Sequence, residues 1–165
     1  MAKHLDYISP MIYPSHYADG NYGIDHPDIH PYETITAALQ DSKKDVYKRQ
    51  LLESVTFQSG KCIFSVVRRK DMDFYGVESS DLDGIVDQLR ITEGVEVAIF
   101  LHETENHVYK VSMRSNNIVD VSKVAAYFGG GGYIRAAGCT MSGSVHDVIN
   151  NLSGHIEKQM KEYEA

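Results

Sequence analysis

The stretch that decides the fold runs from residue 128 to residue 139 and reads Phe128-Gly129-Gly130-Gly131-Gly132-Tyr133-Ile134-Arg135-Ala136-Ala137-Gly138-Cys139. Four consecutive glycines separate an apolar helical pattern from a strand-like segment. Helices usually stop at one glycine, so the run exceeds what a cap requires. Glycine adopts positive φ and lets a ligand approach the backbone, and successive N–H groups in such a loop can hold an anion. With Arg135 beside it, the run indicates contact with a phosphate, and a flexible linker is the alternative.

The same stretch resembles the glycine-rich signature of the C-terminal, DHH-associated domain of DHH-family phosphoesterases. That signature has four glycines, a histidine, two variable residues and then Ala-Ala-Gly. This chain departs from it at Tyr133, which stands where the family has histidine. Four further segments carry the resemblance: Tyr75-Gly76-Val77, Asp83-Gly84-Ile85-Val86, Glu93-Gly94-Val95-Glu96-Val97-Ala98 and Ser112-Met113-Arg114-Ser115. Together, over residues 51–165, they resemble the nanoRNase-type branch, which combines oligoribonuclease and phosphoadenosine-phosphate phosphatase activity.

The resemblance implies a site for the phosphate end of a short nucleotide chain, formed by Arg114, Ser115 and the glycine loop of Gly129, Gly130, Gly131 and Gly132. Arg114 would offer a charged fork to the phosphate, and Arg135 would add a second charge. Without the resemblance, Arg114 reads equally well as a surface residue of a strand, and Ser115 as part of a turn. A tyrosine is neutral at pH 7. Tyr133 would therefore supply a hydrogen bond or a ring that stacks on a base, but no positive charge.

Metal-dependent phosphoester hydrolysis needs a cluster of carboxylates and histidines. In the DHH family this cluster lies in a separate N-terminal domain that carries an Asp-His-His motif, and this chain contains no Asp-His-His. Asp81, Asp83 and Asp87 recur at helical spacing, which favours a solvated face over a metal site. We therefore expect no catalytic residue and no metal ligand in this chain. The manganese or magnesium would belong to a missing DHH domain, and the chain alone would be inactive.

The expected partners are short RNA or a mononucleotide bisphosphate. Two other functions remain open on the sequence. One is a stand-alone module that binds nucleotides or RNA. The other is a fragment of a carbohydrate-active enzyme, because residues 1–43 resemble part of a glycoside-hydrolase-like barrel family in the segment Ser9-Pro10-Met11-Ile12-Tyr13-Pro14-Ser15-His16-Tyr17. That segment is too short for such a barrel, which needs roughly 200 residues or more.

The N-terminal part differs in composition from the rest. Residues 1–43 hold all 4 prolines and four of the 8 histidines. Those histidines (His4, His16, His26 and His30) match no standard zinc spacing. Residues 45–50 resemble translated sequencing-adapter read-through, which indicates two joined reading frames, and a polar linker is the alternative. We predict that residues 1–50 are a foreign or linker segment that packs poorly, followed by a substrate-binding domain over residues 51–165.

Composition sets the remaining bounds. The net charge of −7 excludes a general attraction to nucleic acid or membrane, yet residues 108–139 carry four cations against one carboxylate. The 2 cysteines give neither a disulfide framework nor a zinc motif, so two buried free thiols are expected. The sequence contains no run of the roughly 18 apolar residues that a membrane helix requires, and no signal-peptide pattern. A cytoplasmic protein is expected.

From residue 51 the pattern alternates between strands and helices, which predicts an α/β fold with a layered mixed sheet and flanking helices. Strands are expected over residues 62–67, 95–102, 108–113 and 134–141. Apolar residues at helical spacing predict a helix over residues 82–89, with Ser79 or Ser80 as its N-cap. A second helix is expected after Asp120, and a third after Ser144, where Asp147 would complete a capping box.

Overall fold

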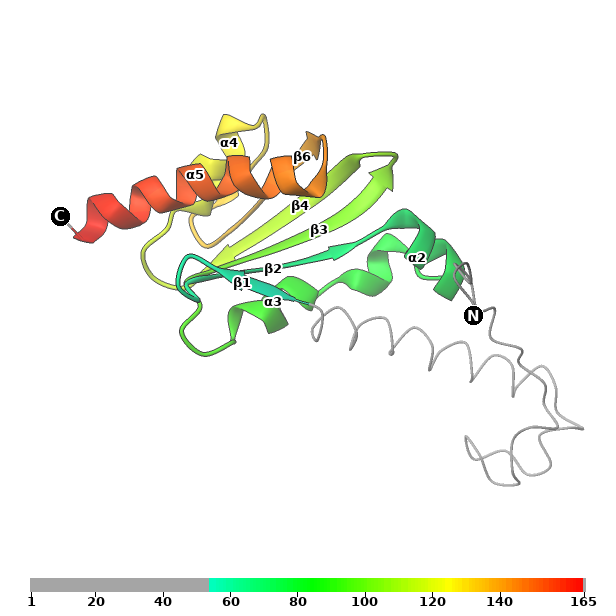
Figure 1. Ribbon diagram of the computed structural model, residues 1–165, viewed down its shortest axis with the longest axis horizontal. Helices are drawn as coiled ribbons and strands as arrows, with labels where there is room; N and C mark the ends of the chain where they lie inside the picture. The colour runs from blue at the N-terminus through cyan, green and yellow to red at the C-terminus, as the bar shows by residue number, and fades with distance from the viewer. Residues whose placement is uncertain (1–53, 165) are drawn as a thin grey trace, which may run out of the picture.

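The computed structural model describes residues 54–164, and the predictions made for residues 1–50 lie outside that range. The described part is a six-stranded mixed sheet with helices on both faces (Figure 1). Its strands are β1 (Val55–Phe57), β2 (Cys62–Val67), β3 (Val97–Glu105), β4 (Val108–Ser115), β5 (Gly131–Tyr133) and β6 (Ala136–Ser142). Its helices are α2 (Arg69–Tyr75), the 3-10 turn η3 (Ser79–Leu82), α3 (Ile85–Arg90), α4 (Val121–Tyr127) and α5 (Val145–Glu164). The predicted α/β class with a layered mixed sheet is confirmed.

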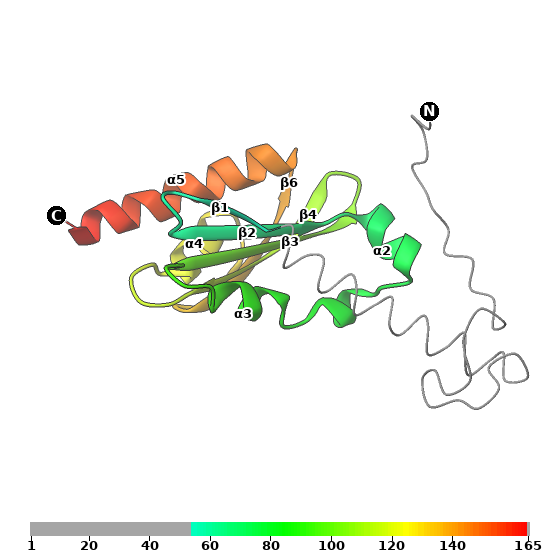
Figure 2. The same cartoon turned by 60° about the horizontal axis from the view of Figure 1, so that its bottom comes forward.

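The strand order is β1-β2-β3-β4-β6-β5. Only β2 and β3 are parallel, because the chain crosses between them through α2, η3 and α3. All other neighbours are antiparallel. Helices α4 and α5 lie on one face of the sheet, called here the α5 face, and α2 and α3 lie on the other, called the α3 face (Figure 2). Among the described residues, no helix is long and apolar enough to span a bilayer.

Each face has its own apolar core, because side chains of a strand alternate between the two faces. Val111 and Met113 of β4 join the core under α4 and α5, together with Leu152 and Ile156 of α5. The core of the α3 face joins Ala98 and Phe100 of β3 to residues of α2, η3 and α3. On that face the β6 residues are not fully buried. This leaves the β4–β6–β5 end of the α3 face accessible.

Two of the three predicted helix caps are confirmed, whereas the N-cap expected at Ser79 or Ser80 was wrong, because η3 begins after Glu78 and α3 after Gly84. The Asp120 side chain accepts hydrogen bonds from the backbone N–H groups of Ser122 (3.1 Å) and Lys123 (3.3 Å) at the start of α4. At the start of α5, the Ser144 N–H donates to Asp147 and the Asp147 N–H donates to Ser144 Oγ. These bonds satisfy N–H groups that have no partner inside the helix.

Several sequence-based boundaries were wrong; the strand expected over residues 95–102, for example, spans Val97–Glu105. The helix expected over residues 82–89 is split into η3 and α3, because Gly84 takes a left-handed conformation (φ +89°) between them. Its apolar residues are nevertheless buried on one side, as the spacing predicted. The strand expected from residue 134 begins at Ala136. Ile134 and Arg135 form the two-residue turn of a hairpin, whose first strand is made by residues 131–133 of the glycine run.

Candidate functional site

A cavity of about 640 Å³ lies at the open end of the α3 face. The glycine run forms one side of it, and β4 and β6 form its floor. Its polar lining residues come mainly from one face of β4 and β6. The full lining is Lys110, Val111, Ser112, Arg114, Phe128, Gly129, Gly130, Gly131, Gly132, Tyr133, Ala136, Ala137, Gly138, Cys139 and Thr140.

Strand register places the cavity residues in rows across the sheet. Tyr133 lies opposite Ala136, and Ala136 lies opposite Arg114, so the tyrosine and the arginine share a face with one small residue between them. The next row joins Gly131, Gly138 and Ser112. Residues directly opposite each other in antiparallel strands present their side chains on the same side. The floor is therefore low at its centre, with Tyr133 at one border and Arg114 at the other.

Arg114 is oriented by contacts within the protein. Its Nε donates to Oδ1 of Asp87 on α3 over 3.1 Å, and its Nη1 donates to the Met113 carbonyl over 3.1 Å. The side chain keeps 29% of its surface exposed. Since a guanidinium carries five N–H donors, donors remain for a ligand on the cavity side.

Ser115 lies away from the cavity, on the opposite face of the sheet from Arg114. It is 1% exposed, and its Oγ donates to the Ile134 carbonyl over 3.4 Å. Its backbone N–H donates to the Arg135 carbonyl. In this structure the hydroxyl therefore holds the β5–β6 turn against the end of β4, and the structure does not bring Ser115 together with Arg114.

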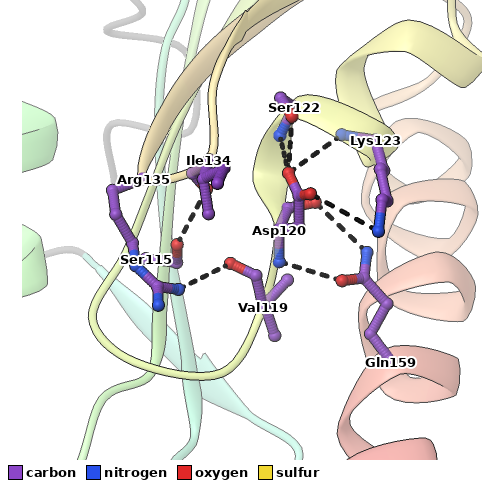
Figure 3. A network of polar contacts seen from close by, with 8 residues as sticks. All are labelled: Ser115, Val119, Asp120, Ser122, Lys123, Ile134, Arg135 and Gln159. Carbon is purple, nitrogen blue, oxygen red and sulfur yellow. Dashed lines mark hydrogen bonds and ion pairs between the residues drawn. The ribbon is translucent and has the colours of Figure 1, made fainter.

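Arg135 is likewise outside the cavity lining. Its guanidinium donates to the carbonyl group of Val119 (Figure 3) and to that of Asn117, both in the loop between β4 and α4. The same loop is held from its other side by the buried carboxylate of Glu96, which accepts hydrogen bonds from three consecutive backbone N–H groups, those of Asn117, Ile118 and Val119. The Arg135 guanidinium thus binds carbonyl groups of this loop and does not contribute its charge to the floor of the cavity.

The fold requires glycine at different positions of the run for different structural reasons. A Cβ on Gly130 would lie 2.2 Å from the Gly138 carbonyl oxygen, and one on Gly132 would lie 2.5 Å from the Ala136 carbonyl oxygen. Both contacts are impossible, so these glycines are required by the close approach of two backbones. Gly129 has φ +74°, a left-handed conformation that favours glycine. Three of the four glycines therefore have a reason within the fold.

Gly131 is the exception. Its φ is not positive, and a Cβ there would meet no atom within 4 Å. Its register partner Gly138 lies opposite Ser112 on the cavity floor, so that empty space belongs to the cavity. Nothing in the described part of the fold requires glycine at this position.

The backbone N–H groups of the run are also divided. Gly129 donates to the Ala126 carbonyl and Gly130 donates to the Ala125 carbonyl, as expected at the end of α4. Gly131 and Gly132 belong to β5, and the antiparallel ladder with β6 takes up one of their two N–H groups. At most one N–H group of the run is therefore left for an anion, fewer than the successive donors expected from the sequence.

Sequence reasoning missed three polar residues of the cavity. Lys110 and Ser112 precede Arg114 at intervals of two on β4, and Thr140 lies opposite Lys110 on β6. The signal was available, because strand residues at i, i+2 and i+4 line one face. Together Lys110 and Arg114 give the cavity two cations on the same strand face.

Both cysteines are free and buried, as expected. Burial raises the pKa of the Cys139 thiol, which borders the cavity. Burial, followed by the nearby Glu96 carboxylate, raises the pKa of Cys62 to about 12. Over residues 54–164, no group of three or more His, Cys, Asp or Glu side chains is placed to hold a metal ion. The arrangement can bind an anion by charge and hydrogen bonds, without metal ligands of its own.

Comparison with protein families finds two matches. The model of the DHHA1 domain family matches residues 59–162. That of DUF4015, described as "Putative glycosyl hydrolase domain", matches residues 1–58. The chain is also 37% identical over 94 residues to the bifunctional oligoribonuclease and PAP phosphatase NrnA of Thermus thermophilus. That alignment covers 57% of this chain and 28% of the relative.

Two solved structures show the same fold. An exopolyphosphatase-related protein from Bacteroides fragilis superposes with a TM-score of 0.68 at 21% identity, over 88% of this chain and 42% of that protein. The pGpG-specific phosphodiesterase PggH from Vibrio cholerae gives a TM-score of 0.51 at 10% identity, over 78% of this chain and 42% of that protein. The chain thus spans less than half the length of each of these three proteins.

Proposed function

The chain belongs to the DHHA1 domain family through residues 59–162, and on this basis we propose that its cavity on the α3 face binds the phosphate end of a nucleotide or short oligoribonucleotide. The catalytic step of the relatives would then fall to a DHH domain outside this chain. The described residues offer no metal cluster, so a manganese or magnesium ion would be bound by that other domain.

One observation carries this proposal: the glycine run and Arg114 border the same cavity, although they are separate in the sequence and come from different strands. Phosphate is recognised by charged guanidinium forks and by backbone N–H groups, and this cavity offers the Arg114 guanidinium beside the glycine backbone. Lys110 adds a second cation. The Tyr133 side chain, which is 83% exposed at the border, would donate one hydrogen bond from its hydroxyl.

The substrate class follows from the relative with the higher identity. The name of the Thermus thermophilus protein describes an oligoribonuclease and PAP phosphatase, and both activities act on phosphate groups of nucleotides. A cavity of about 640 Å³ suits a nucleotide and is too small for a duplex. We therefore propose short RNA or a mononucleotide bisphosphate as the ligand.

Titration calorimetry of the full chain with a 5′-phosphorylated diadenylate tests the proposal. The Arg114→Ala variant should bind about 10- to 100-fold more weakly, because it loses a charge-assisted hydrogen bond. The Lys70→Ala variant is the matched control, since it removes one exposed cation that does not line the cavity. Equal affinity of the wild type and the Arg114→Ala variant, or no binding by the wild type at millimolar ligand, would contradict the proposal.

A further inference from the structure

A second feature adjoins the cavity. Three aromatic rings from α4 and α5 pack together there: Tyr127, Phe128 and His155. The ring centroids of Tyr127 and His155 are 4.0 Å apart, and those of Phe128 and His155 are 5.4 Å apart. Tyr127 and Phe128 are 5.2 Å apart in an edge-to-face arrangement. We call these three residues the aromatic cluster.

The aromatic cluster borders two hollows at once. Phe128 lines the phosphate cavity, immediately before the glycine run. Tyr127 and His155 line a groove of about 420 Å³ between α4 and α5, which both lie on the α5 face (Figure 1). Since Phe128 packs against both other rings, the cluster connects the cavity beside the glycine run to this groove.

The Tyr127 ring faces solvent although it is large and apolar. It is 70% exposed, and yet the His155 ring supports it on one side. A ring that is held by a neighbour and open on its other side can stack on a planar ligand at a low cost in side-chain entropy. Tyr133, the exposed tyrosine of the cavity border, has no ring contact among the described residues. Of the two, Tyr127 is therefore the better-prepared stacking surface.

The charges of the groove favour a neutral ligand group. Lys123 and Lys158 line the groove, but Lys123 pairs with Asp120 (3.6 Å) and Lys158 pairs with Glu162 (4.0 Å). In the cavity, Lys110 has no ion pair among the described residues, and Arg114 keeps further N–H donors beside its ion pair with Asp87. A phosphate is thus attracted to the cavity, whereas the groove offers rings with little net charge.

We propose that the aromatic cluster is a nucleobase-stacking site, which takes a base of the same nucleotide chain whose phosphate lies in the cavity. This proposal rests on the proposed function and extends it by a second contact. Stacking of a base on an aromatic side chain tolerates every base, because each base has a π face. The site would therefore contribute affinity for nucleotides over other phosphate esters without selecting a sequence.

Two ligands separate the base contact from the phosphate contact. One is 5′-phosphorylated diadenylate, and the other is the same dinucleotide with both bases absent. The wild-type full chain should bind the first roughly 5- to 100-fold more tightly than the second, which corresponds to the usual contribution of one stacked base. The Tyr127→Ala variant should lose this preference and keep the affinity for the ligand without bases. Tyr127→Phe, which keeps the ring, should retain the preference.

The outcomes distinguish the two proposals. If Tyr127→Ala keeps the wild-type preference for bases, or if Tyr133→Ala removes it instead, the stacking site is not at the aromatic cluster, while the phosphate site stands. If the Arg114→Ala variant binds both ligands as the wild type does, the phosphate site is wrong. A change of sedimentation coefficient on Tyr127→Ala without ligand would show that a second copy of the chain covers the cluster, and this would overturn the stacking site.

Discussion

The Nε atom of Arg114 lies 3.1 Å from Oδ1 of Asp87, and this ion pair ties the cation of the cavity to helix α3. Asp87 is also 3.8 Å from the Nε atom of Arg90, so its single carboxylate is shared by two guanidinium groups. The pair fixes where the Arg114 fork lies before any ligand arrives. It also places a negative charge near the proposed phosphate site, and these two effects act in opposite directions.

Substitution of Asp87 separates the two effects. Asp87→Asn keeps an acceptor oxygen for Arg114 and removes the charge, so phosphate affinity should rise about two- to tenfold through lower repulsion. Asp87→Ala removes the acceptor as well and should bind more weakly than Asp87→Asn. Calorimetry with the phosphorylated dinucleotide at low salt measures both. Weaker binding by Asp87→Asn than by the wild type would show that the carboxylate itself is needed.

Substitution by alanine should have different effects at Gly131 and at Gly130: a loss of ligand affinity at the first and a loss of stability at the second. Gly131→Ala places a methyl group in open space on the cavity side, so stability should change by less than about 0.5 kcal/mol while ligand affinity falls. Gly130→Ala brings its Cβ to 2.2 Å from the Gly138 carbonyl oxygen, so it should lower the free energy of unfolding by about 1–3 kcal/mol. Urea unfolding and calorimetry on both variants make the comparison. Unchanged affinity in Gly131→Ala would mean that the ligand does not approach this backbone.

Tyr133 offers a test of how the border of the cavity binds phosphate. Tyr133→Phe should weaken binding about 2- to 10-fold if the hydroxyl donates a hydrogen bond, and should change nothing if the ring only stacks. Tyr133→His should strengthen binding at pH 6 relative to pH 8, because a histidine gains its positive charge near pH 6.5. The ligand phosphate titrates in the same range, so each variant is compared with the wild type at the same pH. The same ratio at both pH values would exclude a contact from this position.

Substitution of the buried Glu96 should lower the stability of the fold. Glu96 is 6% exposed, and its Oε1 atom accepts hydrogen bonds from the backbone N–H groups of Asn117, Ile118 and Val119. Glu96→Gln removes the negative charge that strengthens these bonds. The free energy of unfolding should fall by about 1.5–3 kcal/mol. The exposed Glu93→Gln is the matched control and should change it by less than about 0.5 kcal/mol. Equal stability of the two variants in urea would mean that the loop does not depend on this carboxylate.

Protonation of His102 should make the fold less stable at acidic pH. Burial first, and then the positive charge of Lys110, lower its pKa, and Asp83 opposes them. The unfolded chain therefore binds the proton more readily, so the free energy of unfolding should fall as the pH drops below about 6.5 toward the folded-state pKa. Above pH 6.5 this group has no effect. His102→Gln should remove part of the difference in urea midpoint between pH 7.5 and 5.5, and Lys110→Gln should reduce it. If the urea midpoint of His102→Gln depended on pH as strongly as that of the wild type, His102 would not be the group responsible.

The sequence predicted the layers well because burial follows periodicity. Leu82, Ile85, Val86 and Leu89 are all buried in one cluster although their helix is broken at Gly84. The break itself was not predicted. One glycine within a series of apolar residues at helical spacing lowers the helix propensity, but it does not determine whether the helix breaks at that position. Strand β5 was hidden for a similar reason. Glycine is depleted in strands, and only the pairing of residues 131–133 with β6 makes that segment extended.

The site was predicted in part. Arg114 and the glycine run do meet on one cavity, as the resemblance implied. The resemblance assigned Ser115 to the same site as Arg114, but neighbours on a strand point to opposite faces. The contacts of Arg135 depend on a two-residue turn and on a loop 16 or more positions away, and no local pattern carries that information.

The glycine run has a consequence for how this protein can change over generations. Selection for folding alone keeps Gly129, Gly130 and Gly132, because their reasons lie in backbone conformation and close packing. Position 131 is held by no such requirement. A descendant that no longer used the cavity would be free to vary there first, while the rest of the run stayed intact. In any lineage that keeps the other three glycines, a glycine at position 131 would thus indicate that the cavity still binds a ligand, and another residue there would indicate that it does not.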